Sequence, residues 1–362
     1  MTSHAVTLAI LIGVPAALRF VGFGEPLAAI VGALAALCLA MPLGPSDLAN
    51  LLDFSRTDPN DAVILVLAVV ASLLAGCHAA SRPNRPLGWY APGDAAVVGT
   101  LLVAFVLGAR AFEVSVAAVV SAGLAIGVVA WLAMAGVGAL LPGRGSNATA
   151  PMASTPKRVG IALLALVLIC SQSVPAVLLG LLTPLEAFTL FSLPVALVFR
   201  LVAGLIQGRR LAGYGSDLLR GIADGAWIVL AMFAARIATT ALTVAGPGDL
   251  GLTLSPMPLM AVFAGAIMVL GLIVGPTYGA LLAAAIFAPV LKAAGVPAAT
   301  SALVLGSALT LAFARPSFGF GLLSPAFGGP ARQVSGSEAG AIAAGVAIVL
   351  VFSAVMAATG GG

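Results

Sequence analysis

Apolar residues fill this 362-residue chain in block after block, and this pattern limits what the chain can fold into. Hydrophobic residues make up 61% of the sequence and charged residues only 8%, whereas soluble domains carry about 25% charged residues. A helix needs roughly 20 apolar residues to cross a bilayer core about 30 Å thick. Helices and closed barrels satisfy their own backbone polar groups in lipid, and these blocks are continuous rather than alternating. The sequence therefore predicts an all-α, polytopic membrane protein.

The blocks and the polar stretches between them predict about 10–12 membrane segments. We expect apolar segments at residues 5–20, 26–43, 62–80, 95–109, 114–141, 159–182, 185–206, 218–245, 258–274, 278–294, 298–314 and 338–358. Residues 207–217 are predicted to form a loop before the segment 218–245. A connector rich in Gly, Ser and Pro at 142–158 separates an N-terminal transmembrane half, 1–141, from a C-terminal half, 159–362.

The distribution of charge predicts an orientation and excludes several functions. Lys and Arg alternate between successive loops, which predicts a cytoplasmic connector at 142–158 and an external N-terminus. The net charge of +4 comes from scattered basic residues, so no nucleic-acid partner is expected. The sequence contains neither a phosphate-binding G-x-x-x-x-G-K-[ST] loop nor an H-E-x-x-H metal helix. The lipid bilayer is the expected surrounding, and an enzyme is the least expected class.

A Gly-Pro pair interrupts an apolar run at Gly275 and Pro276. Such a pair breaks a helix, and a break at membrane depth is tolerated only where protein or water covers the freed backbone groups. Broken helices of this kind form ion and substrate sites in secondary transporters. We therefore predict that Gly275, Pro276 and Thr277 bind an ion. An ordinary turn between two helices is the alternative explanation.

A second break follows the short apolar segments at 278–294 and 298–314, which are predicted to be broken or re-entrant helices. Arg315 at this break could hold a carboxylate through a bidentate contact, although an arginine at a helix end often extends to the membrane interface. We predict a substrate site formed by Arg315, Ser317, Gly319 and Arg236, the last of these lying inside the segment 218–245. Thr310 and Pro316 are the additional predicted ion ligands.

Several short motifs in the second half, taken in order, resemble the large membrane subunit of TRAP transporters, the DctM-like permeases. The motifs are LTPLEA at 182–187, GLIVGP at 271–276, APV at 288–290, GVP at 295–297 and RPSFG at 315–319. The resemblance covers about residues 159–358. It implies an elevator-type secondary transporter of the bacterial inner membrane that couples Na⁺ to uptake of an organic acid such as a dicarboxylate. A small membrane subunit and a periplasmic substrate-binding protein are the implied partners, and no cofactor besides Na⁺ is implied.

The sequence departs from that family at three places. The acidic residue expected just before the proline is Gly275 here, and the first proline of the later tip is Arg315. The first half shows no clear Gly-Ser-rich hairpin element. Two alternatives therefore stay open beside the transporter subunit, namely a non-transporting membrane scaffold and a carrier of the same superfamily that works alone.

Overall fold

The computed structural model describes residues 4–41, 95–116, 211–246 and 254–313, together with residues 119, 122 and 123 and scattered positions between 167 and 205. Every regular element among these residues is a helix, which confirms the all-α prediction. The helices are α1 (His4–Phe20), α2 (Glu25–Ala40), α5 (Ala95–Ala111), α9 (Leu211–Ala245), α10 (Pro256–Ile273), α11 (Pro276–Ala293) and α12 (Ala298–Phe313).

Proline and glycine set several of the helix boundaries. α2, α10 and α11 each have a proline at the first or second helical position, where the missing N–H removes no intrahelical hydrogen bond. Gly22, Gly275 and Gly295 have positive φ angles in the turns that separate successive helices. Glycine adopts this conformation without a side-chain penalty, so the chain can reverse within a few residues.

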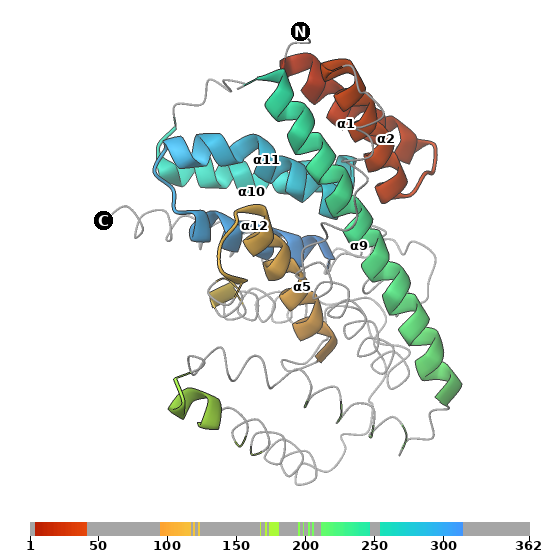
Figure 1. Ribbon diagram of the computed structural model, residues 1–362, viewed down its shortest axis with the longest axis vertical. Helices are drawn as coiled ribbons and strands as arrows, with labels where there is room; N and C mark the ends of the chain where they lie inside the picture. The colour runs from red at the N-terminus through yellow and green to blue at the C-terminus, as the bar shows by residue number, and fades with distance from the viewer. Residues whose placement is uncertain are drawn as a thin grey trace, which may run out of the picture.

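The helices form two hairpins, which both contact the long helix α9, and a pair of helices that packs on the second hairpin (Figure 1). α1 packs against α2, and this N-terminal hairpin contacts α9, where Gly24 lies against the ring of Trp227 in the middle of that helix. α10 and α11 form a second hairpin that also contacts α9. α12 packs against α5 and closes the other side of the second hairpin. Described segments from both halves of the sequence therefore share one helical body.

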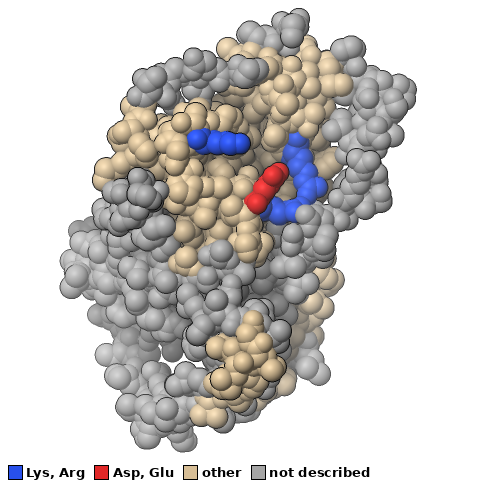
Figure 2. Space-filling model, turned by 60° about the vertical axis from the view of Figure 1, so that its left-hand side comes forward, with Lys and Arg blue, Asp and Glu red and all other residues tan. Residues whose placement is uncertain are grey.

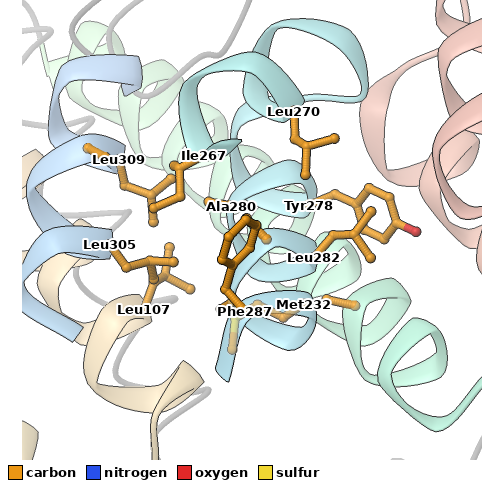
Figure 3. Close-up of a cluster of buried hydrophobic side chains, with 14 of the residues drawn as sticks. Leu107, Met232, Ile267, Leu270, Tyr278, Ala280, Leu282, Phe287, Leu305 and Leu309 are labelled. Carbon is orange, nitrogen blue, oxygen red and sulfur yellow. The ribbon is translucent and has the colours of Figure 1, made fainter. Parts of the chain in front are cut away.

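A single apolar core joins these helices. Figure 3 shows Leu107 of α5, Met232 of α9, Ile267 of α10 and Leu305 of α12 gathered around α11. The core also contains an edge-to-face contact of Phe112 with Phe263, whose ring centroids lie 5.9 Å apart. This arrangement is the favoured one for aromatic pairs. Helix α11 is thus the central element of the described structure.

The outer surface of the described helices is also apolar. Three helical stretches, Gly225–Ala245, Pro256–Ile273 and Pro276–Ala293, are long and apolar enough to cross a membrane. Large side chains such as Val269 and Leu272 of α10 are more than half exposed, and charged residues are sparse on the described part of the face shown in Figure 2. These features indicate a multi-pass membrane protein.

The helix positions agree with most of the segments predicted for the described residues. The segments at 5–20, 26–43, 95–109, 258–274, 278–294 and 298–314 correspond to helices within a few residues. The loop predicted at 207–217 is wrong in its second part, because α9 already begins at Leu211. Glycine and polar residues lower helix propensity by at most about 1 kcal/mol each, so the long helix continues through them. The segment predicted at 218–245 lies within α9, which also ends at Ala245. The other predicted segments lie mainly outside the described residues.

Candidate functional site

The predicted break at Gly275 exists, and it lies inside the protein. α10 ends at Ile273 and α11 begins at Pro276, with a two-residue turn between them. Residues 274–280 are all buried. Gly275 adopts a φ of 119°, a conformation that residues with a side chain rarely take. The turn is therefore a buried corner between two apolar helices. An ordinary exposed loop would not be buried in this way.

The side chain that covers this corner is Glu25, the first residue of α2. Its Oε1 atom accepts a hydrogen bond of 2.7 Å from the backbone N–H of Tyr278, 253 residues away in the sequence. The amide of Thr277 also acts favourably on the carboxylate. Free N–H groups at a helix N-terminus favour a negative charge. Glu25 thus caps the N-terminus of α11 while standing in the first turn of α2.

The contact between Glu25 and Gly275 is close. A Cβ atom added to Gly275 would overlap the carboxyl group of Glu25. The glutamate carboxyl therefore occupies the space into which a side chain at position 275 would project.

Three buried polar atoms at this corner have no hydrogen-bond partner. They are Oε2 of Glu25, Oγ1 of Thr277 and Nη1 of Arg19. Glu25 is only 2% exposed and Thr277 is fully buried. Arg19, in the last turn of α1, is near enough for its charge to act on Glu25. A buried polar group without a partner is unfavourable, so these atoms distinguish the corner from the apolar core around it.

Tyr278 connects the corner to α1 as well. Its hydroxyl group donates a hydrogen bond of 3.3 Å to the carbonyl oxygen of Leu11. Pro15 stands four residues after Leu11 inside α1 and lacks an N–H, so that carbonyl has no intrahelical donor. Figure 3 shows the Tyr278 ring pointing from α11 away from the cluster toward the N-terminal helices. Tyr278 thus satisfies a carbonyl that Pro15 leaves free.

Replacing Tyr278 by phenylalanine tests this bond. Tyr278→Phe leaves the buried Leu11 carbonyl without a donor, and we expect the free energy of unfolding to fall by about 1–2 kcal/mol. Pro15→Ala restores an N–H that can pair with Leu11. Tyr278→Phe is therefore expected to be milder in the Pro15→Ala background by about 1 kcal/mol. Thermal denaturation of the four proteins in detergent measures both effects, and equal losses in the two backgrounds would argue against this pairing.

The structure places only some of the predicted site residues. Gly275, Pro276 and Thr277 lie together at the buried corner. Arg236 is exposed on α9 rather than buried with them. Thr310 belongs to α12, and its side chain lies outside the described part of the structure. Arg315, Pro316, Ser317 and Gly319 also lie outside the described residues, so their proposed roles stay predictions.

Glu25 is the site residue that the sequence-based prediction missed. A signal was present, because Glu25 is one of only 12 acidic residues and lies at a Gly-Glu-Pro corner between two apolar segments. That corner resembles the Gly275-Pro276 corner in its chemistry. The pattern could identify two corners, but it could not show that they meet.

The helices and the buried corner define the chain as a multi-pass helical membrane protein with a polar site where two helix N-termini meet. No family model, no curated protein and no solved structure matches the chain.

Proposed function

We propose that this chain is the membrane permease subunit of an ion-coupled secondary transporter that takes up a small organic anion such as a dicarboxylate. The observation that carries the proposal is the buried corner at Gly275, where α11 begins inside the protein and a carboxylate faces its N-terminus. Carriers place helix N-termini and polar groups at sheltered sites inside the protein, and the N-terminus of α11 lies at such a site after a hairpin turn.

The composition of the surrounding helices supports the same function. An ionisable residue inside a membrane protein is unfavourable and usually marks an ion or substrate pathway. Glu25 is such a residue, lying between two apolar hairpins. Na⁺ as coupling ion, the TRAP-type assembly with a small membrane subunit and a periplasmic binding protein, and the bacterial inner membrane follow from the family resemblance and belong to this proposal.

Uptake into proteoliposomes tests the proposal. The purified protein, reconstituted alone and with any subunits that copurify, is expected to accumulate at least one radiolabelled mono- or dicarboxylate when an inward Na⁺ or proton gradient is imposed. Glu25→Gln should reduce this uptake at least about tenfold, because the substitution removes the buried ionisable carboxyl group from the site. Glu113→Gln is the matched control, since Glu113 is exposed at the end of α5.

Each other result has a clear meaning. Uptake that is equal in Glu25→Gln and Glu113→Gln would show that the corner is not part of the pathway. A folded protein that moves no carboxylate under either gradient, with its copurifying subunits present, would contradict the transporter and favour the scaffold.

A further inference from the structure

Two contacts at the ends of α1 place this helix along the second half of α9. At one end, Nδ1 of His4 lies 3.0 Å from the carbonyl oxygen of Gly246, the residue directly after α9. At the other end, the turn after α1 brings Gly24 against the ring of Trp227. The helical rise separates Trp227 from Gly246 by about 28 Å, which is close to the thickness of a bilayer's hydrocarbon core. The two contacts therefore lie at the two ends of one membrane crossing.

The sequence of α9 changes at the level of Trp227. The stretch Gly225–Ala245 is long and apolar enough to cross a membrane, and Arg236 is its single charged residue. The preceding part of α9, residues 211–224, contains two aspartates and an arginine, and it extends past the N-terminal hairpin (Figure 1). Charged residues are unfavourable in the hydrocarbon core. One membrane boundary therefore lies close to Trp227.

Apolar side chains project from the protein at this boundary. In the turn after α1, Phe20 is 94% exposed and Val21 is 73% exposed, and Phe23 and Trp227 are also exposed. Tryptophan is enriched where a membrane meets water, because its ring is apolar and its N–H group is polar. This surface continues the apolar outer face of the helices that can cross the membrane. The lipid of the same membrane is thus the partner that fits it.

The distribution of Lys and Arg indicates which leaflet this is. Arg19 lies in the last turn of α1, and Arg209 and Arg210 directly precede α9 in the sequence. The segment that follows α9, residues 246–255, contains neither Lys nor Arg. Loops rich in Lys and Arg lie on the cytoplasmic side of a membrane. The boundary at Trp227 is therefore predicted to face the cytoplasm.

We propose that an interfacial anchor holds this end of the protein in the headgroup region of the cytoplasmic leaflet. The anchor consists of Phe20, Val21, Phe23 and Trp227. The Gly275 corner lies at the same depth, because Glu25 directly follows Gly24 in the sequence and accepts the backbone N–H of Tyr278. The carboxyl group of Glu25 is thus close to the cytoplasmic surface of the membrane rather than at its centre. This placement does not depend on the proposed transport function.

Spin labels on single-cysteine variants measure the depth of the anchor in liposomes. The three native cysteines are first replaced by alanine. One label is then attached to Phe20→Cys in the anchor, to Ser216→Cys in the first part of α9 or to Val262→Cys near the middle of α10, all at exposed positions. Collisions with oxygen, which concentrates in lipid, should be several-fold more frequent at position 262 than at position 216. Collisions with a water-soluble nickel chelate should follow the opposite order, and position 20 should be intermediate in both.

Three results at position 20 would overturn the proposal. Collisions with the nickel chelate as frequent as at position 216 would place the turn in bulk water. Collision rates equal to those at position 262 would place it in the hydrocarbon core. Protection from both reagents would show that protein, rather than lipid, covers the turn.

Trp227 provides a second measurement in case the cysteine variants do not fold. Trp89 and Trp131 are replaced by phenylalanine, so that Trp227 is the remaining tryptophan. In liposomes, lipids with bromine near the headgroup end of the acyl chain should quench its fluorescence several-fold more than lipids with bromine near the bilayer centre. Equal or stronger quenching by the central bromines, or quenching by a water-soluble reagent alone, would contradict the anchor.

A membrane-impermeant maleimide tests the side of the membrane. In cells that produce Ser216→Cys without the native cysteines, the reagent should label the protein only after the membrane has been opened. Labelling in intact cells would overturn the assignment to the cytoplasmic leaflet. Since none of these measurements requires transport, a confirmed anchor without uptake would contradict only the proposed function.

Discussion

Gly275→Ala is expected to destabilise the protein by about 3 kcal/mol or more. The φ of 119° at this position is strained for any residue with a side chain, which costs about 1–3 kcal/mol. The added methyl group would also overlap the Glu25 carboxyl, so the hairpins would have to separate or the hydrogen bond to Tyr278 would have to break. The Gly275→Ala substitution thus carries two independent penalties, the strained backbone angle and the overlap with Glu25. Thermal or denaturant unfolding in detergent, followed by circular dichroism, measures the loss.

Gly265→Ala is the control for this substitution. Gly265 lies in the middle of α10, one helix before the corner, and no atom lies within 4 Å of an added Cβ. Alanine is favoured over glycine in a helix by up to about 1 kcal/mol, so this variant should be as stable as the wild type or slightly more stable. Equal stability of the two variants would contradict the described corner geometry.

Gly108→Ala is expected to destabilise the protein by about 2–3 kcal/mol through a different mechanism. Gly108 lies at a close approach of α5 to α12, where an added Cβ would overlap the carbonyl oxygen of Ala302 and approach the backbone N of Gly306. Backbone atoms cannot rotate away as a flexible side chain can, so the helices must move apart. Helices in membranes depend on small residues for such close packing.

The consequence of separating α5 from α12 should reach the core, because Leu107 and Leu305 pack in the same buried cluster (Figure 3). Gly13→Ala in α1 is the control, since nothing lies within 4 Å of a Cβ added there. The midpoint of thermal unfolding should fall clearly for Gly108→Ala and stay within about 1 °C for Gly13→Ala. A drop of the same size in both variants would point to a general effect of glycine replacement rather than to helix contact.

The sequence predicted the helices well because their ends carry local signals. Apolar blocks and Pro or Gly at their borders are enough to locate α1, α2, α10 and α11 within a few residues. The start of α9 was missed because residues 211–217 contain two glycines, a serine and an aspartate. These residues weaken a helix only slightly, and a following apolar run of this length extends the helix through them.

The site was predicted in part, for a similar reason. The Gly275-Pro276 break is a local feature and could be predicted from two residues. The contact of Glu25 with Tyr278 is a tertiary feature across 253 residues, and no local pattern states which corner meets which. The hydrogen bond between Tyr278 and Leu11 is also a tertiary contact. Pro15 indicates that the Leu11 carbonyl lacks an intrahelical donor, but it does not show which residue supplies one. The position of the turn could therefore be predicted from the sequence. Only the structure shows that Glu25 contacts this turn.

The long span of these two hydrogen bonds has a consequence for biosynthesis. Residues 11 and 25 leave the ribosome well before Tyr278, which supplies the donors for both the Leu11 carbonyl and the Glu25 carboxylate. The hairpin of α1 and α2 therefore reaches the translocon before Tyr278 has been synthesised. At that point the Leu11 carbonyl and the Glu25 carboxyl group still lack their final partner. Such long-range closure is slow relative to local helix formation. Maturation of the N-terminal hairpin is thus a late event, which is completed only after α11 has been inserted.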